Sequence, residues 1–508
     1  MSHVRGSLTS ALFIAGFFAL SASISPAALA DSARERPATV HLEKSPLSGG
    51  VLMSRAIRAG IVKLPVGFPA GKHPAFNCKP APCTLPNVQA SEGGSPVDED
   101  PISIDPNNVR HVLTAGNDYN CGSSLQGYFA STNAGRTFTH SCGTLASGAS
   151  GGDGDPIVGW DLNSVAYRGG IDSAGNLEIV LGKSTDFGQT WSTPVAAAKV
   201  SGVDMDKPWL EVDANAASPR KNALYISMTE FYSNNDSQIG VSHSIDGGQT
   251  WTLVNVSTRQ IWPNNVDQFS DLAIGDDGTV YLTWQRCPVT GQTGDCGGTT
   301  AGMYFSKSTD GGATWSAEKK IHDVHLVPDT CGAFYGCLPH TSERVANIPV
   351  VAIDNGASAN HGRLYVMDYD WNGTYMKERV SASGDAGATW SNPVGVTPDS
   401  DQHDQFFEWI NISSKGVVGV TWLDRSLDPN NVNYDAFAAT SKDGGASFGT
   451  NYRLSTVSSD PFNDGFGSAF MGDYTGNAWA GGKQKLYMSW PDTRTNTDTQ
   501  DEVGGLRP

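Results

Sequence analysis

Short apolar stretches, each followed by a turn rich in Gly, Asn or Asp and then by a second apolar stretch, recur along most of the chain. In the segment 267–286, DQFSDLAIGDDGTVYLTWQR, the stretches LAI and VYLTW read as strands and GDDG as the tight turn between them. The copies begin near Asp98, Asp153, Asp204, Asp267, Val345, Gln402 and Met471. The pattern predicts seven β-hairpins, most of which start with a polar residue.

A second pattern alternates with these hairpins. One octapeptide has Ser first, Asp or Asn third, Gly fifth, Thr or Ser seventh and an aromatic residue eighth. Its six copies occupy residues 131–138, 184–191, 244–251, 308–315, 383–390 and 441–448. The Asp side chain accepts hydrogen bonds across a turn, Gly adopts positive φ, and the aromatic side chain anchors the returning strand. We interpret each copy as a hairpin turn whose Asp is structural.

The alternation of the two patterns predicts the fold class and the domain organisation. Two hairpins per repeat make a four-stranded blade, so the repeats predict an all-β chain folded as a seven-bladed β-propeller, with six blades as the alternative. We expect the ring to be closed by residues near the N-terminus or by the short tail after Arg494. The predicted parts are a signal peptide (1–30), a partly irregular N-terminal extension (31–94) and the propeller domain (95–508).

The first thirty residues carry the pattern of a secretory signal. Arg5 precedes an apolar run over 11–20, and the small residues that follow end in Ala28-Leu29-Ala30. We predict cleavage after Ala30. No later stretch is long and apolar enough to span a bilayer, so we expect a secreted protein, extracellular or periplasmic.

Eight cysteines lie beyond the predicted cleavage site. They form four couples of near neighbours: Cys78 with Cys83, Cys121 with Cys142, Cys287 with Cys296, and Cys331 with Cys337. An even number in an exported chain favours disulfides that staple loops locally. Zinc ligation is the alternative, but the chain has no C-x2-C pair and no His cluster beside the cysteines.

The composition and the motifs of the chain argue against several classes of binding partner and of enzyme. The formal net charge is −18, which argues against binding to nucleic acid or to anionic membrane surfaces. The chain is 39% hydrophobic and therefore able to bury a large core. It has no G-x-S-x-G nucleophile elbow on a strand-to-helix turn, no H-E-x-x-H, no Walker loop and no dinucleotide fingerprint following a strand. The sequence therefore gives no support to an esterase, metalloprotease, kinase or dehydrogenase.

The octapeptides resemble the Asp boxes, or BNR repeats, of the sialidase (neuraminidase) superfamily, over about residues 95–495. The resemblance implies an active site on the propeller face opposite the octapeptide turns. In that family three arginines bind the substrate carboxylate, an Asp is the acid/base, and a Tyr activated by a Glu is the nucleophile.

Carried over by position, the resemblance assigns these roles to residues of this chain. Tyr474, in GDYTG, corresponds to the nucleophile, and Glu408 to the Glu that activates it. Asp118 and Asp155 are both candidates for the acid/base, and the sequence does not choose between them. The family's Arg-Ile-Pro motif is absent, and the stretch before the first blade reads VDEDPISIDP.

Three arginines follow second strands, in the segments WQR, WLDR and WPDTR, and resemble the substrate-binding arginines: Arg286, Arg425 and Arg494. Their alternative role is structural, in ion pairs with carboxylates such as Asp424 or Asp492.

The function that this resemblance implies is that of a glycoside hydrolase of exo-alpha-sialidase type, acting on terminal acidic sugars of glycans. Two alternatives stay open, a non-catalytic glycan- or protein-binding propeller and a polysaccharide lyase that acts on uronic-acid polymers, in which His403 is a candidate base. A carboxylate paired with Tyr474 favours the hydrolase, a Tyr or His without a carboxylate favours the lyase, and an unpaired Tyr surrounded by aromatic side chains favours binding. We expect a monomer that requires no cofactor, with a composition compatible with a structural calcium ion.

Overall fold

The computed structural model describes residues 42, 44–64, 81–291, 294–481 and 484–508. All of them belong to one compact unit, Ala38–Pro508. The predicted signal peptide and Cys78 lie outside the described residues. Within the described part of the chain, no helix has the length and apolar character that crossing a bilayer requires.

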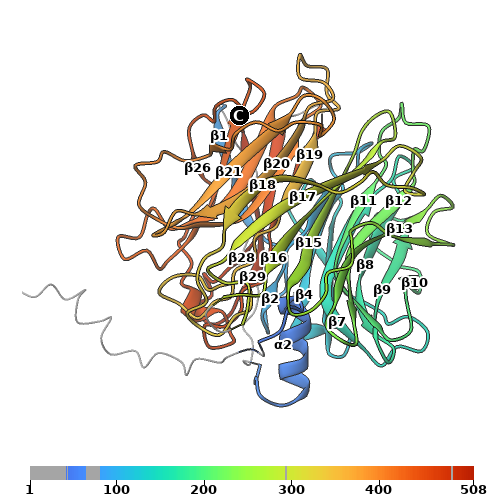
Figure 1. The fold of residues 1–508 in the computed structure, drawn as a ribbon, viewed down its shortest axis with the longest axis horizontal. Coiled ribbons are helices and arrows are strands. Elements are labelled where there is room, and N and C mark those ends of the chain that lie inside the picture. The colour runs from blue at the N-terminus through green and yellow to red at the C-terminus, as the bar shows by residue number, and fades with distance from the viewer. Residues whose placement is uncertain (1–41, 43, 65–80, 292–293, 482–483) are drawn as a thin grey trace, which may run out of the picture. The chain divides into compact units, whose positions relative to one another are not determined.

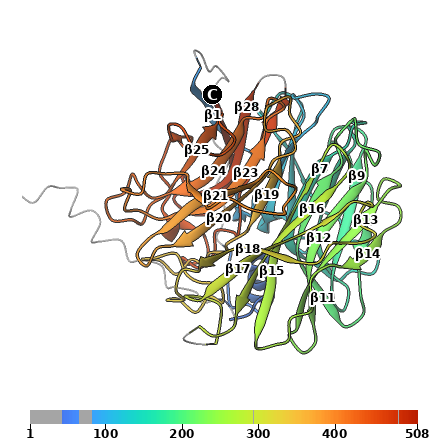
Figure 2. The ribbon, with the colours of Figure 1, turned by 45° about the horizontal axis from the view of Figure 1, so that its top comes forward.

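Seven antiparallel sheets form a seven-bladed β-propeller, as predicted (Figures 1 and 2). Blade 1 contains β2 (Val97–Asp98), β4 (Val112–Asp118), β5 (Gln126–Ser131) and β6 (Thr139–Cys142), and β3 (Ile102–Ile104) pairs with β4. Blade 2 contains β7 (Gly151–Trp160), β8 (Ala166–Ser173), β9 (Leu177–Ser184) and β10 (Val195–Ala198). Blade 3 contains β11 (Val203–Val212), β12 (Leu224–Tyr232), β13 (Ser237–Ser244) and β14 (Thr252–Asn255).

The next three blades repeat this order. Blade 4 contains β15 (Asn265–Ile274), β16 (Val280–Pro288), β17 (Thr300–Ser308) and β18 (Lys319–His325). Blade 5 contains β19 (Val350–Ile353), β20 (Leu364–Trp371), β21 (Met376–Ser383) and β22 (Val394–Gly395). Blade 6 contains β23 (Gln405–Ile412), β24 (Val418–Asp424), β25 (Asp435–Ser441) and β26 (Tyr452–Arg453).

Blade 7 joins distant parts of the chain. It contains β27 (Gly476–Ala480), β28 (Lys485–Asp492), β29 (Gln500–Arg507) and, outermost, β1 (Cys83–Gln89). Strand β1 pairs antiparallel with β29, and Cys83 lies opposite Arg507. Both segments considered for closure, the tail after Arg494 and residues near the N-terminus, therefore complete the last blade.

Each octapeptide connects the third and fourth strands of a blade, as predicted. In 244–251 the hydroxyl of Ser244 accepts a hydrogen bond from Gly248 N (3.0 Å), and Asp246 accepts one from Thr250 N (2.9 Å). Gly248 has a φ of +80°, a conformation that Gly adopts without steric cost. These hydrogen bonds fix the conformation of the turns, so the Asp side chains in them have a structural role.

The innermost strands of four blades carry a bulge near their start. Asp155, Lys207, Phe269 and Phe407 have φ angles of +50°, +50°, +60° and +58°, and the pairing register shifts at each position. A bulge changes the direction of the side chains beside it. These bulges turn the polar side chains at the beginning of the hairpins toward the propeller axis. We call this end of the propeller, where the inner strands begin, the blade-start end.

Three of the predicted cysteine couples form disulfides, Cys121–Cys142, Cys287–Cys296 and Cys331–Cys337. The fourth, Cys78 with Cys83, involves a residue outside the described part of the chain.

The short 3₁₀ helices η1 (Tyr119–Cys121) and η2 (Pro461–Asn463) lie in connections of the same propeller.

Helix α2 (Gly49–Arg58) lies at the blade-start end, beside β7 (Figure 1). Ser48 caps its N-terminus and accepts a hydrogen bond from Val51 N. On its apolar side Met53 is fully buried in a cluster with Tyr119 and Phe470. Because this packing removes apolar surface from water, it stabilises the helix on the propeller.

Candidate functional site

The turn that precedes α2 enters the centre of the blade-start end, where carboxylates of three blades meet it. Ser48 N donates to Asp206 Oδ2 (2.7 Å), and Ser48 Oγ donates to Asp155 Oδ1 (3.0 Å). Gly49 N donates to Asp473 Oδ2 (2.8 Å). Residues that are remote in sequence therefore converge on one short peptide.

Side chains of blade 4 and of the loop before β19 hold the carbonyl groups of the same turn. Gln268 Nε2 and Tyr335 Oη donate to Pro46 O at 3.2 and 2.8 Å. Arg344 Nη1 donates to Leu47 O at 3.1 Å. We call the six side chains that hold residues 46–49 the central site: Asp155, Asp206, Gln268, Tyr335, Arg344 and Asp473.

Negative groups outnumber positive groups in and around the central site. The buried carboxyl groups are those of Asp98, Glu99, Asp155, Asp206 and Asp473, and the cations are Lys207 and Arg344. Arg344 forms an ion pair with Asp473 through Nε (2.7 Å) and Nη2 (2.9 Å). The remaining carboxyl groups are buried, and burial together with their mutual repulsion favours states in which some of them keep their protons.

Burial and mutual repulsion determine which carboxyl groups stay protonated. Burial, followed by the charges of Glu99 and Asp206, raises the pKa of Asp155 well above its ordinary value. Burial, followed by the charge of Asp473, raises the pKa of Glu99 to about 8. Burial and the neighbouring charges therefore favour the protonated form of Asp155, the form that a proton donor needs.

Tyr474 lies beside Asp155, on the adjoining side of the axis. Its hydroxyl donates to the carbonyl oxygen of Pro156 (3.2 Å), the residue that follows Asp155. The Lys207 ammonium lies 3.5 Å from the centre of its ring, and Trp209 contacts the ring edge-on. Burial, followed by the charge of Glu99, raises the pKa of the Tyr474 hydroxyl, so the phenol is protonated in this state.

Glu408, the predicted partner of Tyr474, lies in a different environment. Its Oε1 accepts a hydrogen bond from Ile348 N (2.9 Å), and burial raises its pKa to about 8. Burial, followed by the charge of Glu408, raises the pKa of Glu378 well above its ordinary value, so these two carboxyl groups are neighbours. Within the described residues, no hydrogen bond joins Tyr474 to Glu408 or to another carboxylate. Its ring lies beside those of Trp209 and Trp409, so this tyrosine has the surroundings that we expected of a binding site.

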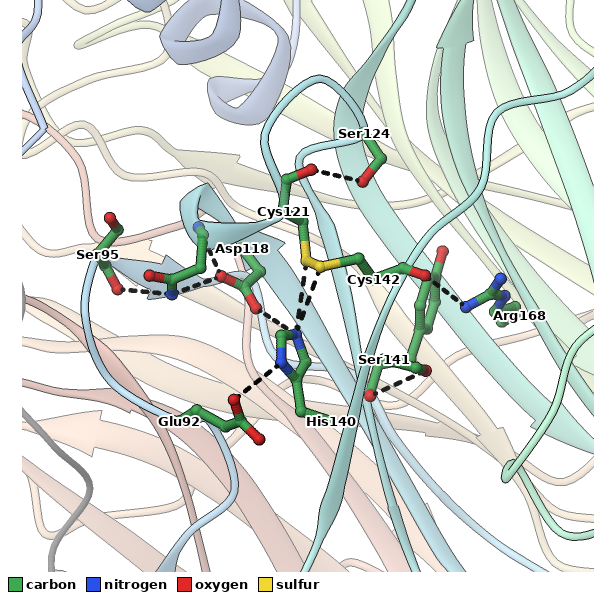
Figure 3. Close-up of a disulfide and its surroundings, with 11 residues drawn as sticks. Glu92, Ser95, Asp118, Cys121, Ser124, His140, Ser141, Cys142 and Arg168 are labelled. Atoms are coloured by element: carbon green, nitrogen blue, oxygen red, sulfur yellow. Dashed lines mark hydrogen bonds and ion pairs between the residues drawn. A yellow bond between two sulfur atoms is a disulfide. The ribbon is translucent and has the colours of Figure 1, made fainter.

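The two acid/base candidates are separated by strand geometry. Asn117, at the end of β4, accepts a hydrogen bond from Asp155 N (2.8 Å). Asp118 is the next residue, and successive side chains of a strand point to opposite faces. Its Oδ2 contacts His140 Nε2 (2.9 Å) beside the Cys121–Cys142 disulfide (Figure 3). Asp155 belongs to the central site, and Asp118 does not.

Two of the three predicted substrate-binding arginines, Arg286 and Arg494, are engaged by carboxylates of their own blades. Arg286 forms two hydrogen bonds to Asp267 (2.6 and 2.8 Å) and two to Glu318 (2.8 and 3.0 Å). Arg494 forms two to Asp492, both at 2.8 Å. This is the structural ion pairing that we considered as the alternative.

Arg425 is fully buried and differs in its partners. Its Nη1 donates to the carbonyl groups of Pro339 (2.6 Å) and Asn431 (3.0 Å), and it lies 3.6 Å from Asp404 rather than pairing with Asp424. Burial lowers its pKa to about 10. This arginine holds the loops around blade 6 together.

A cavity of about 490 Å³ follows the propeller axis and is lined by inner strands of all seven blades. Its walls include Trp209, Trp409 and Trp479, and the rings of Trp209 and Trp409 lie 4.4 Å apart. Asp271 and Glu211 also line it, and burial raises the pKa of Asp271 to about 7. We call this cavity the axial channel.

Sequence reasoning gave no functional role to the segment before the propeller or to the loop residues Tyr335 and Arg344. A signal for the helix was present, because Ser48 precedes the mixed apolar and basic stretch GGVLMSRAIR. No motif marks Tyr335 or Arg344, which reach the axis only through the folded loop.

No family model and no curated protein matches the chain. Similar solved structures include a Hadza microbial sialidase (TM-score 0.44, 12% identity, 82% of this chain and 68% of that chain). They also include the Penicillium chrysogenum alpha-L-arabinanase complexed with arabinobiose (0.44, 14%, 68% and 92%) and a PL25 ulvan lyase (0.46, 11%, 87% and 94%). The likenesses concern the propeller fold alone.

Proposed function

We propose that the protein is a secreted, carbohydrate-active propeller, a glycoside hydrolase of exo-alpha-sialidase type whose reaction centre is the central site with Tyr474. One observation carries the proposal. The hydrogen bond from Tyr474 to the carbonyl of Pro156 holds a phenol beside the buried carboxyl group of Asp155. A nucleophile and a proton donor at one site are the two groups that glycosidic cleavage requires.

Each group has a role that follows from its environment. Asp155 donates its proton to the departing glycosidic oxygen as the bond to the anomeric carbon breaks. Tyr474 Oη attacks that carbon, and its proton passes to an ionised carboxylate near the central site. Water then cleaves the bond between the sugar and Tyr474 and gives a proton to Asp155, while the carboxylate returns its proton to Tyr474. Arg344 offers a bidentate fork to a substrate carboxylate, the role that we had expected of Arg286, Arg425 and Arg494. The proposed reaction uses no cofactor.

The test is hydrolysis of a fluorogenic sialoside by the mature protein. We expect turnover by the wild type and its loss in Tyr474→Phe and Asp155→Asn, while Arg286→Lys, which retains a cation in a structural ion pair, keeps it. Absence of turnover in every variant, including those described below that open the site, would contradict the hydrolase. Release of unsaturated uronate from a uronic-acid polymer would instead establish the lyase.

Glycan binding in the axial channel is a second candidate function. Three Trp side chains and two carboxyl groups line the channel, and such rings stack on sugar faces while carboxylates accept sugar hydroxyls. Titration of the protein with oligosaccharides, followed by Trp fluorescence, tests this candidate. We expect Trp479→Ala to abolish the signal if the channel binds glycans and Tyr474→Phe to leave it unchanged.

A further inference from the structure

Residues 46–49 offer the central site both donors and acceptors. A hydroxyl group and two N–H groups reach the carboxylates of Asp155, Asp206 and Asp473. Two carbonyl oxygens are held by three donors, Gln268, Tyr335 and Arg344. A sugar offers the same kinds of hydrogen-bonding group: hydroxyl groups that donate, and hydroxyl or carboxylate oxygens that accept.

We propose that residues 44–58, the plug segment, are an internal ligand that occupies the substrate site, and that the six side chains of the central site are its substrate-binding residues. This inference rests on the proposed function, because it takes the ligand to be an acidic sugar. The Ser48 hydroxyl stands where a sugar hydroxyl binds, and Leu47 O stands where a sugar carboxylate meets Arg344.

The plug segment leaves part of the site unsatisfied. Among the described residues, Asp206 Oδ1 has no hydrogen-bond partner, although the side chain is fully buried. A buried polar atom without a partner costs about 1–3 kcal/mol. A ligand with several hydroxyl groups makes the hydrogen bond that the peptide turn does not, so this atom points to a polyhydroxylated ligand.

Contacts outside the central site keep the plug segment in place. Arg58 and Ser54 both contact Asp153, and Lys44 contacts Asp329 (2.7 Å). Because the segment is tethered to the propeller, its effective concentration at the site is on the order of millimolar. A free sugar must compete with it, and the site is therefore latent until the segment leaves.

Two glycines allow the plug segment to approach so closely. A Cβ atom at Gly50 would lie 2.5 Å from Asp155 Oδ1, and one at Gly49 would lie 2.0 Å from Phe470 Cε2. A side chain at either position forces the segment or the side chains that it meets to move. Gly50→Val therefore pushes the segment and Asp155 apart without replacing any residue of the central site.

The experiment compares four full-length proteins: wild type, Gly50→Val, the double variant Ser48→Ala/Ser54→Ala, and the control Ala59→Ser at the exposed position that directly follows the segment. The double variant adds no volume and serves if Gly50→Val folds poorly. Amide hydrogen exchange of residues 49–58 reports release of the segment. Calorimetric titration with free sialic acid reports access to the site.

We expect faster exchange and at least roughly tenfold tighter binding in both opened variants, with Ala59→Ser equal to wild type. Asp206→Asn in the Gly50→Val background should weaken binding again. Equal exchange and affinity in all four proteins would overturn the inference, as would faster exchange with no binding of sialic acid. Tighter binding without sialoside hydrolysis would support the inference and contradict the hydrolase, so the two proposals fail separately.

Discussion

The ammonium group of Lys207 lies 3.5 Å from the centre of the Tyr474 ring, inside a site in which carboxyl groups outnumber cations. Lys207 reaches this place because it sits on the bulge of β11, with a φ of +50°, and Tyr474 precedes the inner strand of blade 7. A cation on a ring face is attracted by the ring electrons, and more strongly when the phenol begins to ionise. The positive charge of Lys207 therefore acts both on the buried carboxyl groups and on the phenol of Tyr474.

Replacing Lys207 by Met should shift the pH dependence of hydrolysis. The charge of Lys207 lowers the pKa values of Glu99 and Asp155, so its loss raises both. Asp155 then keeps its proton to higher pH, and we expect the alkaline limb of the kcat/KM profile to move upward by about one pH unit. The profile of Lys320→Met, at an exposed position, should coincide with that of the wild type.

Asp155→Asn and Asp118→Asn should separate the two acid/base candidates. We expect Asp155→Asn to lower kcat by about 100-fold or more, because the amide donates no proton to the leaving oxygen. Asp118→Asn should retain kcat within about threefold, since its partner is His140 rather than the central site. Single-turnover measurements of sialoside cleavage check both values, and the reverse order of effects would transfer the acid role to Asp118.

The free energy of unfolding should fall as the pH rises from about 4.5 to about 8. In this range Glu408 holds its proton in the folded protein but not in the unfolded chain. Its pKa is raised from an ordinary value of 4.5 to about 8. Below about pH 4.5 the group is protonated in both states. Above that, the unfolded chain releases the proton first, so the free energy of unfolding declines until about pH 8, by at most about 1.4 kcal/mol per pH unit.

Glu408→Gln tests this dependence because an amide does not titrate. We expect denaturant unfolding between pH 5 and pH 8 to show a smaller decline for Glu408→Gln than for wild type. Glu92→Gln, at an exposed carboxylate, should not change the slope. A slope that Glu408→Gln leaves unaltered would show that other groups cause it.

Ser441→Ala should destabilise blade 6 by removing the hydroxyl group that holds its octapeptide turn together. Ser441 Oγ accepts a hydrogen bond from Gly445 N (2.9 Å) and donates one to Asp443 (2.6 Å). We expect a loss of about 1–2 kcal/mol in the free energy of unfolding, because a buried N–H group loses its acceptor. Lys442→Ala, an exposed change in the same turn, serves as the control in the same unfolding measurement.

Much of the fold was determined by local sequence. The octapeptide at 244–251 contains every group that its turn uses, from the Ser244 hydroxyl to the φ-permissive Gly248, so its conformation is readable without knowledge of the rest of the chain. The alternating hairpins likewise determined the blade count, because each carries its own strands and turn. The closing strand β1 was less accessible, since its partner β29 lies more than 400 residues away and only ring closure brings them together.

The site depended on tertiary structure. Position relative to the blades placed Tyr474 and Asp155 near the axis, but whether Arg286 is available to a substrate depends on Glu318, which is 32 residues away and whose carboxylate is invisible to a motif. Nor does any local pattern reveal that Ser48 meets Asp155, or that Arg344 joins Asp473. Hydrogen bonds inside a turn join neighbours in sequence, whereas the hydrogen bonds, burial and charge balance of a site are set by groups that only the folded propeller brings together.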